Sequence, residues 1–401
     1  MRVLQICNKA PYPPNDGSSI AIYNMGIGFI SNEVELHVLT INTKKHFKAD
    51  SDVLQNYKTK AHYQSVYENT DVSAFGALKN LFSSQSYFVS RFYFKDFENN
   101  LIEKLKSNTF DVVQLEGLFV ATYIPIIKKY SKAKIVLRAH NIEYLIWQRH
   151  LKNETTVFKK LYLKLQTKRL KNFELKVLKE LDAIVTITDF DKTIFEQEGF
   201  KKPIYTCITG VDVEAYRQKT KTKLKQKTIF YFASMDWMPN VEAVDWFLNN
   251  CWKNILKQVP DAKFIMAGRN MPPRLAKLNQ PNILVVESVK DSGTFYNEHE
   301  IMLVPLLSGS GLRIKIIEGM AYGKAIVSTS VGAEGINYTK GKNILIADSA
   351  ADFTKAVVEL LKDDTKRISL EQGALNFAER EFDNKKVVTG LVNFYKTILN
   401  V

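Results

Sequence analysis

Short apolar runs rich in β-branched residues alternate with stretches of helical periodicity along the whole chain. This alternation is typical of parallel sheets whose strands are joined by crossover helices. The pattern therefore predicts an α/β protein. The runs expected to form strands are residues 2–7, 34–41, 111–117, 134–140, 183–188 and 203–208 in the first half, and 228–234, 263–268, 282–288, 301–305, 325–329 and 343–347 in the second.

Helical periodicity fills most of the segments between these runs, and 401 residues exceed what one core of usual size would need. We therefore expect two αβα domains, residues 1–210 and 211–383, with a polar basic run at 217–227 as the linker. Ligands of such sheets bind at the carboxyl ends of the strands. The predicted helices follow Ser18 and cover Phe75–Lys106, Phe119–Tyr130, Val241–Gln258, Asp352–Lys362 and an amphipathic last segment, Lys385–Leu399.

The formal net charge of +14 is unusual for a globular chain, and much of it lies in residues 151–180, where nine Lys or Arg face three Glu. Apolar residues recur there at near-helical spacing, which predicts a long amphipathic helix. Its basic face is either a solvated helix surface or one attracted to anionic lipid headgroups. Nucleic acid is not expected as a partner, since no nucleic-acid-binding motif accompanies the charge. The apolar positions are Val157, Leu161, Leu165, Leu170, Phe173 and Leu178.

Three scattered cysteines, Cys7, Cys207 and Cys251, form neither a metal-ligand spacing nor a disulfide framework. We expect them to be small buried side chains in a reducing compartment. No run of 18 or more apolar residues is present, and the N-terminal apolar run is too short for a signal peptide. The expected location is the cytoplasm, with the inner face of the membrane as an option if the basic helix binds lipid.

The segment LLSGSGLRIKIIEGMAYGKAIVST, residues 306–329, holds the strongest candidate for a ligand site. Apolar spacing predicts a core helix that starts near Ile314 and ends near Gly323. A core helix does not need Arg313, Lys315 and Glu318 in its first turns. The preceding glycine-rich loop allows close approach of the backbone, and a helix N-terminus offers free N–H groups. This combination suits a phosphate.

Two further candidates follow strands of the first half. The first strand leads into Asp16-Gly17-Ser18-Ser19, where Ser18 or Ser19 is a plausible N-cap and the exposed helix N-terminus a second phosphate contact. A dinucleotide-binding G-x-G-x-x-G motif is absent there. The run ending at 140 places Arg138, His140 and Asn141 at the expected ligand edge, where a histidine is either structural or catalytic. Zinc-protease, P-loop and G-x-S-x-G patterns are absent, which argues against a metal site or a serine hydrolase.

The order of PYPPNDG, RAHNIEY, TGVD, FASMDWMPN, GSGLRIKIIEGMAYGKAIVST and GAEGI resembles the retaining glycosyltransferases of family 4, in a bacterial branch assigned to surface polysaccharide assembly. The resemblance implies the GT-B fold: two Rossmann-like αβα domains that face each other across a cleft, with the helix at 384–401 crossing back to the first domain. It implies a UDP- or GDP-sugar donor, a saccharide or lipid-linked saccharide acceptor, and no cofactor or active-site metal.

The resemblance also implies roles for individual residues. Glu318 matches a glutamate that binds the ribose, Gly17 a glycine near the diphosphate, and His140 a histidine near the donor sugar. Arg313 and Lys315 would join His140 as catalytic residues. The other donor-binding candidates are Ser18, Ser310, Gly311 and Leu312, and the remaining site candidates are Arg138, Asn141, Asn240 and Arg269.

Two departures from the family pattern stand out. Ser310 occupies the position of the first glutamate of the E-x7-E motif, and residues 233–243 lack the usual Arg and Lys pair. We expect Arg313 and Lys315 to supply that charge. Two alternatives stay open: a nucleotide-sugar 2-epimerase of the same architecture, and a non-catalytic scaffold subunit.

Overall fold

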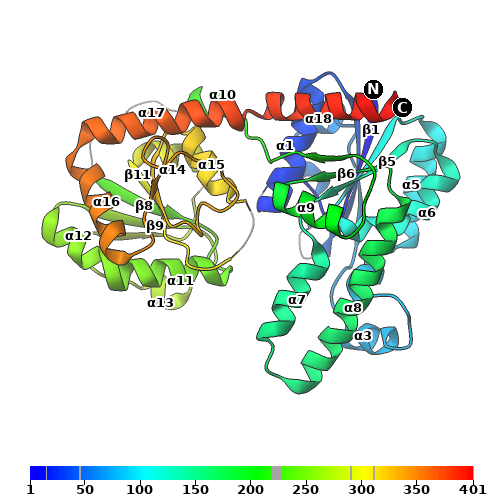
Figure 1. The fold of residues 1–401 in the computed structure, drawn as a ribbon, viewed down its shortest axis with the longest axis horizontal. Helices are drawn as coiled ribbons and strands as arrows, with labels where there is room; N and C mark the ends of the chain where they lie inside the picture. Colours follow the sequence, from blue (N-terminus) through cyan, green and yellow to red (C-terminus); the bar gives the residue numbers. More distant parts are fainter. Residues whose placement is uncertain (15, 45–46, 219–226, 290, 310–311, 401) are drawn as a thin grey trace. The chain divides into compact units, whose positions relative to one another are not determined.

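The computed structural model describes residues 1–14, 16–44, 47–218, 227–289, 291–309 and 312–400 (Figure 1). The chain divides into two compact units, each built on its own parallel sheet. The first unit comprises Met1–Gly210 and Asn384–Val401, and the second comprises Val211–Asp383. We describe each by itself.

The sheet of the first unit has seven parallel strands in the order β3-β2-β1-β4-β5-β6-β7. Most of its residues are buried on both faces, which is why its strands read as continuous apolar runs in the sequence. The strands are β1 (Arg2–Cys7), β2 (Glu35–Thr43), β3 (Gln64–Glu68), β4 (Val112–Glu116), β5 (Lys134–Ala139), β6 (Ala183–Thr186) and β7 (Ile204–Thr206).

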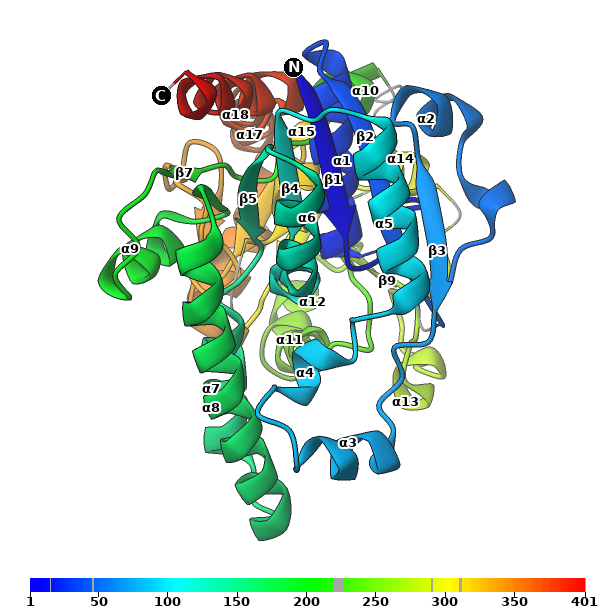
Figure 2. The same cartoon turned by 90° about the vertical axis from the view of Figure 1, so that its right-hand side faces the viewer.

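Helices cover both faces of this sheet, with α5 and α6 in front of it in Figure 2. Leu4 and Ile6 point into the core beneath those helices, whereas Val3 and Cys7 face the core beneath α1 and α18. The helices are α1 (Gly17–Ser31), α2 (Gln55–Lys60), α3 (Ala74–Asn80), α4 (Tyr87–Ser90), α5 (Lys95–Ser107), α6 (Ile124–Tyr130), α7 (Glu143–Asn153), α8 (Val157–Glu180), α9 (Asp189–Gln197) and α18 (Asn384–Leu399), with 3-10 turns at Asp50–Asp52 and Leu118–Tyr123.

The last helix, α18, packs on α1 of the first unit, as expected. The two helices approach so closely that a Cβ at Gly28 would lie 2.2 Å from Cγ2 of Val388, so only glycine fits there. The apolar face of α18 is buried in the same core as β1 and β2. Its buried apolar residues are Val388, Leu391, Val392, Tyr395 and Ile398.

The second unit repeats the arrangement with six parallel strands in the order β10-β9-β8-β11-β12-β13. Within the described residues, both sheets follow the doubly wound strand order in which connections run outward from a central pair. The strands are β8 (Thr228–Phe232), β9 (Lys263–Ala267), β10 (Ile283–Val286), β11 (Ile301–Val304), β12 (Ala325–Ser328) and β13 (Leu345–Ile346). The helices are α10 (Val213–Gln218), α11 (Met238–Phe247), a π-helical turn (Leu248–Trp252), α12 (Lys253–Gln258), α13 (Pro273–Ala276), α14 (Ser292–Glu298), α15 (Ile314–Ala321), α16 (Ala350–Lys362) and α17 (Asp364–Glu381).

Every run expected to be a strand contains one, but one strand and several helices were not predicted. Strand β3 lies at a sheet edge and is only partly buried, so its sequence QSVYE lacks a strong apolar pattern. Helix α17 was also missed. The helical stretch expected over Phe75–Lys106 is divided into α3, α4 and α5. All three cysteines are free and buried, as expected.

The linker expected at 217–227 was misplaced. The chain passes from the first unit to the second at Gly210 and Val211, and residues 219–226 lie outside the described residues. Helix α10 precedes them and already belongs to the second unit, because the ring of Tyr216 stacks on that of Tyr322, with centroids 4.6 Å apart. Arg217, the first residue of the run, is exposed, but it lies within the second unit and not between the two units.

Candidate functional site

The candidate residues of the second unit gather where its strand order reverses, between β8 and β11. In sheets of this kind, the carboxyl ends of the strands on either side of the reversal form the usual ligand position. The glycine-containing loop after β11 leads into α15, which carries Lys315 and Glu318. Ser310 and Gly311 lie outside the described residues.

Helix α15 begins at Ile314, and Arg313 is its N-cap residue with non-helical backbone angles (φ −88°, ψ 86°). Residues two apart within a helix would point about 200° away from each other. Because Arg313 precedes the helix, its side chain is free of that restriction and can share a ligand with Lys315. Gly323 ends the segment in the left-handed conformation (φ 62°) that favours glycine.

Lys315 reaches back to the loop and helix that follow β8. Its Nζ donates to Oδ1 of Asn240 at 2.9 Å and lies 4.8 Å from the ring centroid of Tyr231. The Tyr231 hydroxyl donates to the same Oδ1 at 2.7 Å, and Nδ2 of Asn240 donates to the carbonyl of Ser234 at 2.7 Å. The buried amide of Asn240 thus uses its oxygen to accept from Lys315 and Tyr231 and its nitrogen to donate to Ser234. It is held in place and therefore orients Lys315.

Arg313 is almost completely buried, and its guanidinium carbon lies 5.2 Å from the ring centroid of Trp237. Gly309 makes room for this pair. Its φ is 110°, and a Cβ there would lie 2.7 Å from the Trp237 ring and 2.8 Å from Nη2 of Arg313. We call Tyr231, Trp237, Asn240, Arg313 and Lys315 the Lys315 cluster.

The Lys315 cluster brings two cations together in a poorly solvated place. Burial and the charge of Arg313 lower the pKa of the Lys315 ammonium to about 7, and burial lowers the pKa of Arg313 as well. Burial and mutual repulsion destabilise the charged forms of these two side chains. An anion bound beside them would stabilise both charged forms, so the site favours anion binding. A diphosphate has the charge that this arrangement lacks.

Glu318 follows Lys315 by three residues and so lies on the same face of α15. Its Oε1 accepts a hydrogen bond from the Tyr216 hydroxyl at 3.4 Å, and burial raises the pKa of its carboxyl to about 7. The rings of Tyr216, Tyr322 and Tyr296 form a continuous stack beside it, with centroid distances of 4.6 Å and 4.5 Å. The half-buried carboxylate is thus placed next to a flat aromatic surface.

Two other candidates of the second unit lie near the Lys315 cluster. Arg269 follows β9, is exposed, and donates from Nε to Oγ of Ser234 at 3.2 Å. Ser234 is the residue whose carbonyl holds Asn240, so Arg269 lies beside the loop that orients Lys315. Leu312 is partly buried, and a Cβ on Gly335 would lie 3.5 Å from its Cδ1.

In the first unit, the N-terminus of α1 is capped by Asp16, not by Ser18 or Ser19 as expected. Its carboxylate accepts the N–H groups of Ser18 (3.1 Å) and Ser19 (3.0 Å) because it carries the charge that a helix N-terminus favours. Lys9 pairs with the same oxygen at 2.5 Å. Gly17 is exposed at the first helical position. The negative charge at this helix N-terminus comes from the side chain of Asp16, the residue before it.

His140 follows β5 and is held by Glu116, the last residue of β4. Its Nε2 lies 2.7 Å from Oε2 of Glu116, which Nη1 of Arg138 approaches at 3.2 Å. Gln5 donates to the other carboxylate oxygen at 2.6 Å, and Gln114 donates to that oxygen as well. We call Gln5, Gln114, Glu116, Arg138 and His140 the Glu116 cluster. The hydroxyl of Tyr395 in α18 donates to Gln114, which links the last helix to the cluster.

Charge within the Glu116 cluster fixes the state of His140. Burial alone would raise the pKa of Glu116, but Arg138 and the bonds from His140 and Gln5 lower it to about 2. Burial lowers the pKa of His140, so the ring is neutral near pH 7. An ionised carboxylate only accepts hydrogen bonds, so Nε2 carries the proton and Nδ1 is left as an acceptor. Arg138 is completely buried and acts through Glu116, whereas Asn141 is exposed.

Replacement of Glu116 by Gln is expected to lower the free energy of unfolding by about 3–5 kcal/mol, because the charge of Arg138 then stays buried without its partner. Since the pKa of Glu116 falls from 4.5 to about 2, wild-type stability from this group is present above pH 4.5 and is lost towards pH 2. Urea unfolding at neutral and acid pH measures both effects.

A matched control is Glu35→Gln, which breaks an exposed Glu–Arg pair of the same unit (Arg2 Nε to Glu35 Oε1, 2.7 Å). That change should cost less than about 1 kcal/mol. An equal decrease in the free energy of unfolding for the two variants would show that the buried Glu116–Arg138 pair stabilises the fold no more than the exposed pair does.

The sequence did not single out Glu116, Tyr231 or Trp237. A signal for the first was present: Gln5 and Gln114 are polar residues inside otherwise apolar strands, and buried polar groups need partners. Trp237 stands in the DWMPN segment, which holds no basic residue of its own but supplies the ring on which Arg313 packs.

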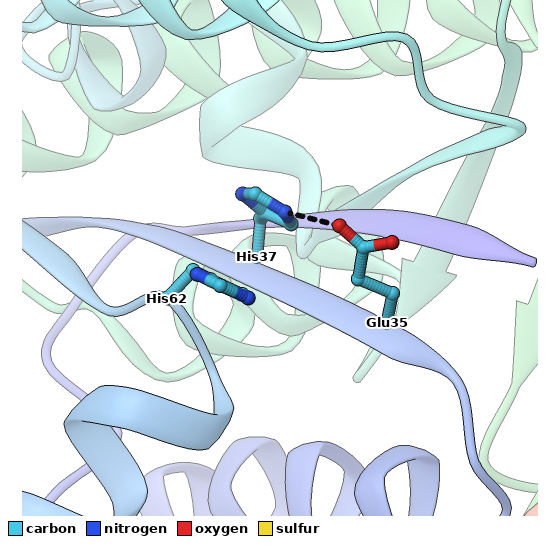
Figure 3. A group of neighbouring side chains, drawn as sticks. All are labelled: Glu35, His37 and His62. Carbon is cyan, nitrogen blue, oxygen red and sulfur yellow. Dashed lines mark hydrogen bonds and ion pairs between the residues drawn. The ribbon is translucent and has the colours of Figure 1, made fainter.

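Glu35, His37 and His62 are the three side chains that lie close enough together, within the described residues, to be considered as metal ligands (Figure 3). The two imidazole rings are stacked, with centroids 4.3 Å apart and planes 15° from parallel. Ring nitrogens bind metals in the plane of the ring, so stacked rings do not point to one ion. Glu35 Oε1 lies 3.2 Å from His37 and also pairs with Arg2. This arrangement fits side-chain packing better than a metal centre.

Known proteins are similar to this chain over nearly its whole length, and the solved structures among them share the architecture described above. Over 409 residues, the chain is 22% identical to a Klebsiella pneumoniae protein described as an uncharacterized 44.6 kDa protein in the cps region, covering 97% of this chain and 98% of that protein. The structure of Anabaena Alr3699/HepE in complex with UDP matches with a TM-score of 0.67 at 11% identity over 99% of this chain and 100% of that one, and HepE has also been solved with UDP-glucose.

Sucrose-phosphate synthase from Thermosynechococcus elongatus matches with a TM-score of 0.70 at 11% identity, over the full length of both chains. These likenesses span both units and show the GT-B fold for the whole chain. The family model matches part of the second unit alone. Residues 226–363, which include the Lys315 cluster and Glu318, match the glycosyl transferases group 1.

Proposed function

We propose that the protein is a retaining, metal-independent glycosyltransferase of family 4, which transfers a sugar from a UDP- or GDP-sugar to a saccharide or lipid-linked saccharide acceptor in surface polysaccharide synthesis. The observation that carries this proposal is the Lys315 cluster, with two cations held at the start of α15 at the position where doubly wound sheets bind ligands. The complexes of HepE with UDP and UDP-glucose favour UDP. The Klebsiella relative from a cps region supports the polysaccharide context.

In this proposal the second unit binds the nucleotide diphosphate and stabilises it as a leaving group. Arg313 and Lys315 are fixed before the reaction, so they oppose the developing negative charge without reorganisation. That is the task that a divalent metal performs in other transferases. Leu312, Ser310 and Gly311 would contribute backbone contacts to the donor, and Arg269 a further charge.

For the first unit we propose that Gly17 and Ser18 contribute to donor binding and that neutral His140 acts on the sugar through its unprotonated Nδ1. Arg138 and Glu116 are then positioning residues, because they set the tautomer of His140 and do not touch substrate. Glu116→Gln should therefore also shift the pH profile of transfer, an effect that a purely structural residue would not produce.

Glu318→Gln is expected to weaken nucleotide binding with the fold intact. A carboxylate that accepts two ribose hydroxyls makes charge-assisted bonds worth about 1.5–3 kcal/mol, so the dissociation constant should rise about 10- to 150-fold. Titration calorimetry with UDP and GDP measures it. Glu359→Gln, which breaks an exposed pair with Lys366 in the same unit, is the matched control. An unchanged affinity for Glu318→Gln would assign this residue to the packing around Tyr216.

A screen of nucleotide sugars, with detection of the released nucleoside diphosphate, tests the proposal as a whole. Release of UDP or GDP that increases with acceptor supports a transferase, and the anomeric proton signal of the product reports retention. Release of a 2-epimerised sugar independent of acceptor would favour the epimerase. Absence of both turnover and thermal stabilisation by UDP or GDP would favour the non-catalytic scaffold.

A further inference from the structure

Helix α8 carries two apolar faces in its first half, only one of which is buried. Leu163 and Leu170 pack into the first unit, whereas Phe158 is 86% exposed. At 100° per residue, the exposed residues occupy an arc of about 100° roughly opposite the buried ones. The six apolar positions noted in the sequence therefore do not form one face. The first three, Val157, Leu161 and Leu165, face solvent. The exposed apolar residues of this half are Val157, Phe158, Leu161 and Leu165.

Helix α3 and the residues after it add a second set of exposed apolar side chains next to α8. The α3 segment is tied to α8 by Nε2 of Gln166 donating to Oδ1 of Asn80 at 2.9 Å, and by Arg169 donating to the carbonyl of Asn80 at 3.0 Å. Both views place α3 at the end of the first unit where the α7–α8 hairpin projects from the sheet (Figures 1 and 2). Phe75 and Phe82 are 77% and 91% exposed, and Leu78 is also exposed.

We call these seven residues, Phe75, Leu78, Phe82, Val157, Phe158, Leu161 and Leu165, the hairpin surface. Single exposed apolar residues are ordinary on a soluble chain, but large ones gathered at one end of a unit mark an interaction surface. Their partner must bury apolar area, because three phenylalanines and three leucines offer few hydrogen bonds.

Charge identifies the partner. Residues 144–173, which form most of the hairpin, carry eight Lys or Arg and one Glu. Lys160, Lys164 and Lys168 are exposed beside the apolar stripe of α8, and Glu154 is paired with Lys159 at 2.6 Å. A helix with exposed Phe and Leu bordered by Lys has the composition that lies in the interface of an anionic bilayer.

We propose that the hairpin surface docks the protein on an anionic lipid bilayer, with its Phe, Leu and Val side chains among the lipid headgroups and acyl chains and its lysines on the phosphates. A second copy fits less well, because a two-fold interface would bring this basic surface against itself. The proposal goes beyond glycosyl transfer and does not depend on it. Membrane binding and enzyme activity are measured separately.

The test is flotation of the full-length protein with vesicles of phosphatidylglycerol and phosphatidylcholine, and with vesicles of phosphatidylcholine alone. We expect binding to the anionic vesicles at low salt that weakens as salt is raised. The triple variant Phe82→Ser, Phe158→Ser, Leu161→Ser should lower the partition coefficient at least about tenfold. Lys160→Gln, Lys164→Gln, Lys168→Gln should lower it about as much and reduce its salt dependence.

Matched controls come from exposed positions of the second unit: Leu284→Ser with Ile368→Ser for the apolar change, and Lys253→Gln, Lys257→Gln, Lys362→Gln for the charge change. Both should bind like the wild type. Absence of binding to anionic vesicles at low salt overturns the proposal, and so does binding that the hairpin variants leave unchanged. A wild-type dimer in light scattering that the triple Ser variant abolishes would assign the surface to a second copy and also overturn it.

Discussion

The Arg313→Ala protein should turn over about 10²- to 10³-fold more slowly than the wild type, the usual cost of removing one fixed group that stabilises developing charge. The effect should fall mainly on kcat, because the charge on the leaving diphosphate is greatest in the transition state. Lys315→Ala should also lower turnover mainly through kcat. Arg313→Lys should also be harmful, since it replaces the planar guanidinium against Trp237 with a point charge.

The measurement is steady-state kinetics with a confirmed donor and acceptor. Arg274→Ala is the control: it removes an exposed arginine of the same unit, paired with Asp245 at 2.5 Å, and should leave turnover unchanged. If all three cluster variants stay within about threefold of wild type, diphosphate stabilisation lies elsewhere, and the α1 N-terminus at Gly17 becomes the first candidate.

The pKa of Lys315 adds a pH signature to the same experiment. Its pKa is about 7 in the free protein, so this amine is mostly deprotonated at pH 8. A bound diphosphate favours the charged form, so binding at pH 8 should take up a proton and weaken as pH rises above 7. Calorimetry in buffers of different ionisation enthalpy detects that proton, and the Lys315→Ala variant should not take it up.

Truncation after Asn384 is expected to leave the first unit unable to fold. It removes five buried apolar side chains of α18 and exposes their partners on α1, at about 1.5–3 kcal/mol for each side chain. Their sum, roughly 7–15 kcal/mol as an upper estimate, equals the whole stability of a typical domain. Expression level and thermal unfolding measure the result. Truncation after Leu399 should be harmless, and a truncation at 384 as stable as the wild type would make α18 a dispensable tail.

The sequence predicted best those elements that are buried on both faces. Strand β8 reads TIFYF because both its faces are covered, so its pattern needs no knowledge of its neighbours. Strand β3 and the division of Phe75–Lys106 into three helices depend on what packs against them. Periodicity also cannot tell which of two apolar faces is buried, which is why the sequence predicted α8 as an amphipathic helix without revealing its exposed apolar stripe.

The candidate site divides in the same way. Arg313 and Lys315 stand within one short segment, so the sequence shows their spacing and the start of the helix, and the structure brings Arg313 to Trp237 and Lys315 to Tyr231. The Glu116 cluster is assembled from three strands, with Gln5 and Glu116 separated by 111 residues. No local pattern joins residues that far apart. Their contact follows from the strand order, which places β4 between β1 and β5.

The return of α18 to the first unit has a consequence for synthesis on the ribosome. Residues 1–210 emerge first, but the core beneath α1 stays open until residues 388–398 are made. The second unit, 173 residues from Val211 to Asp383, is translated in between, which takes about 9–35 s at 5–20 residues per second. The second unit can complete its core first, although it comes later in the chain. Throughout that interval the core that Ile22, Met25 and Phe29 of α1 share with α18 is incomplete, so apolar surface of the nascent first unit stays exposed until the last residues are made.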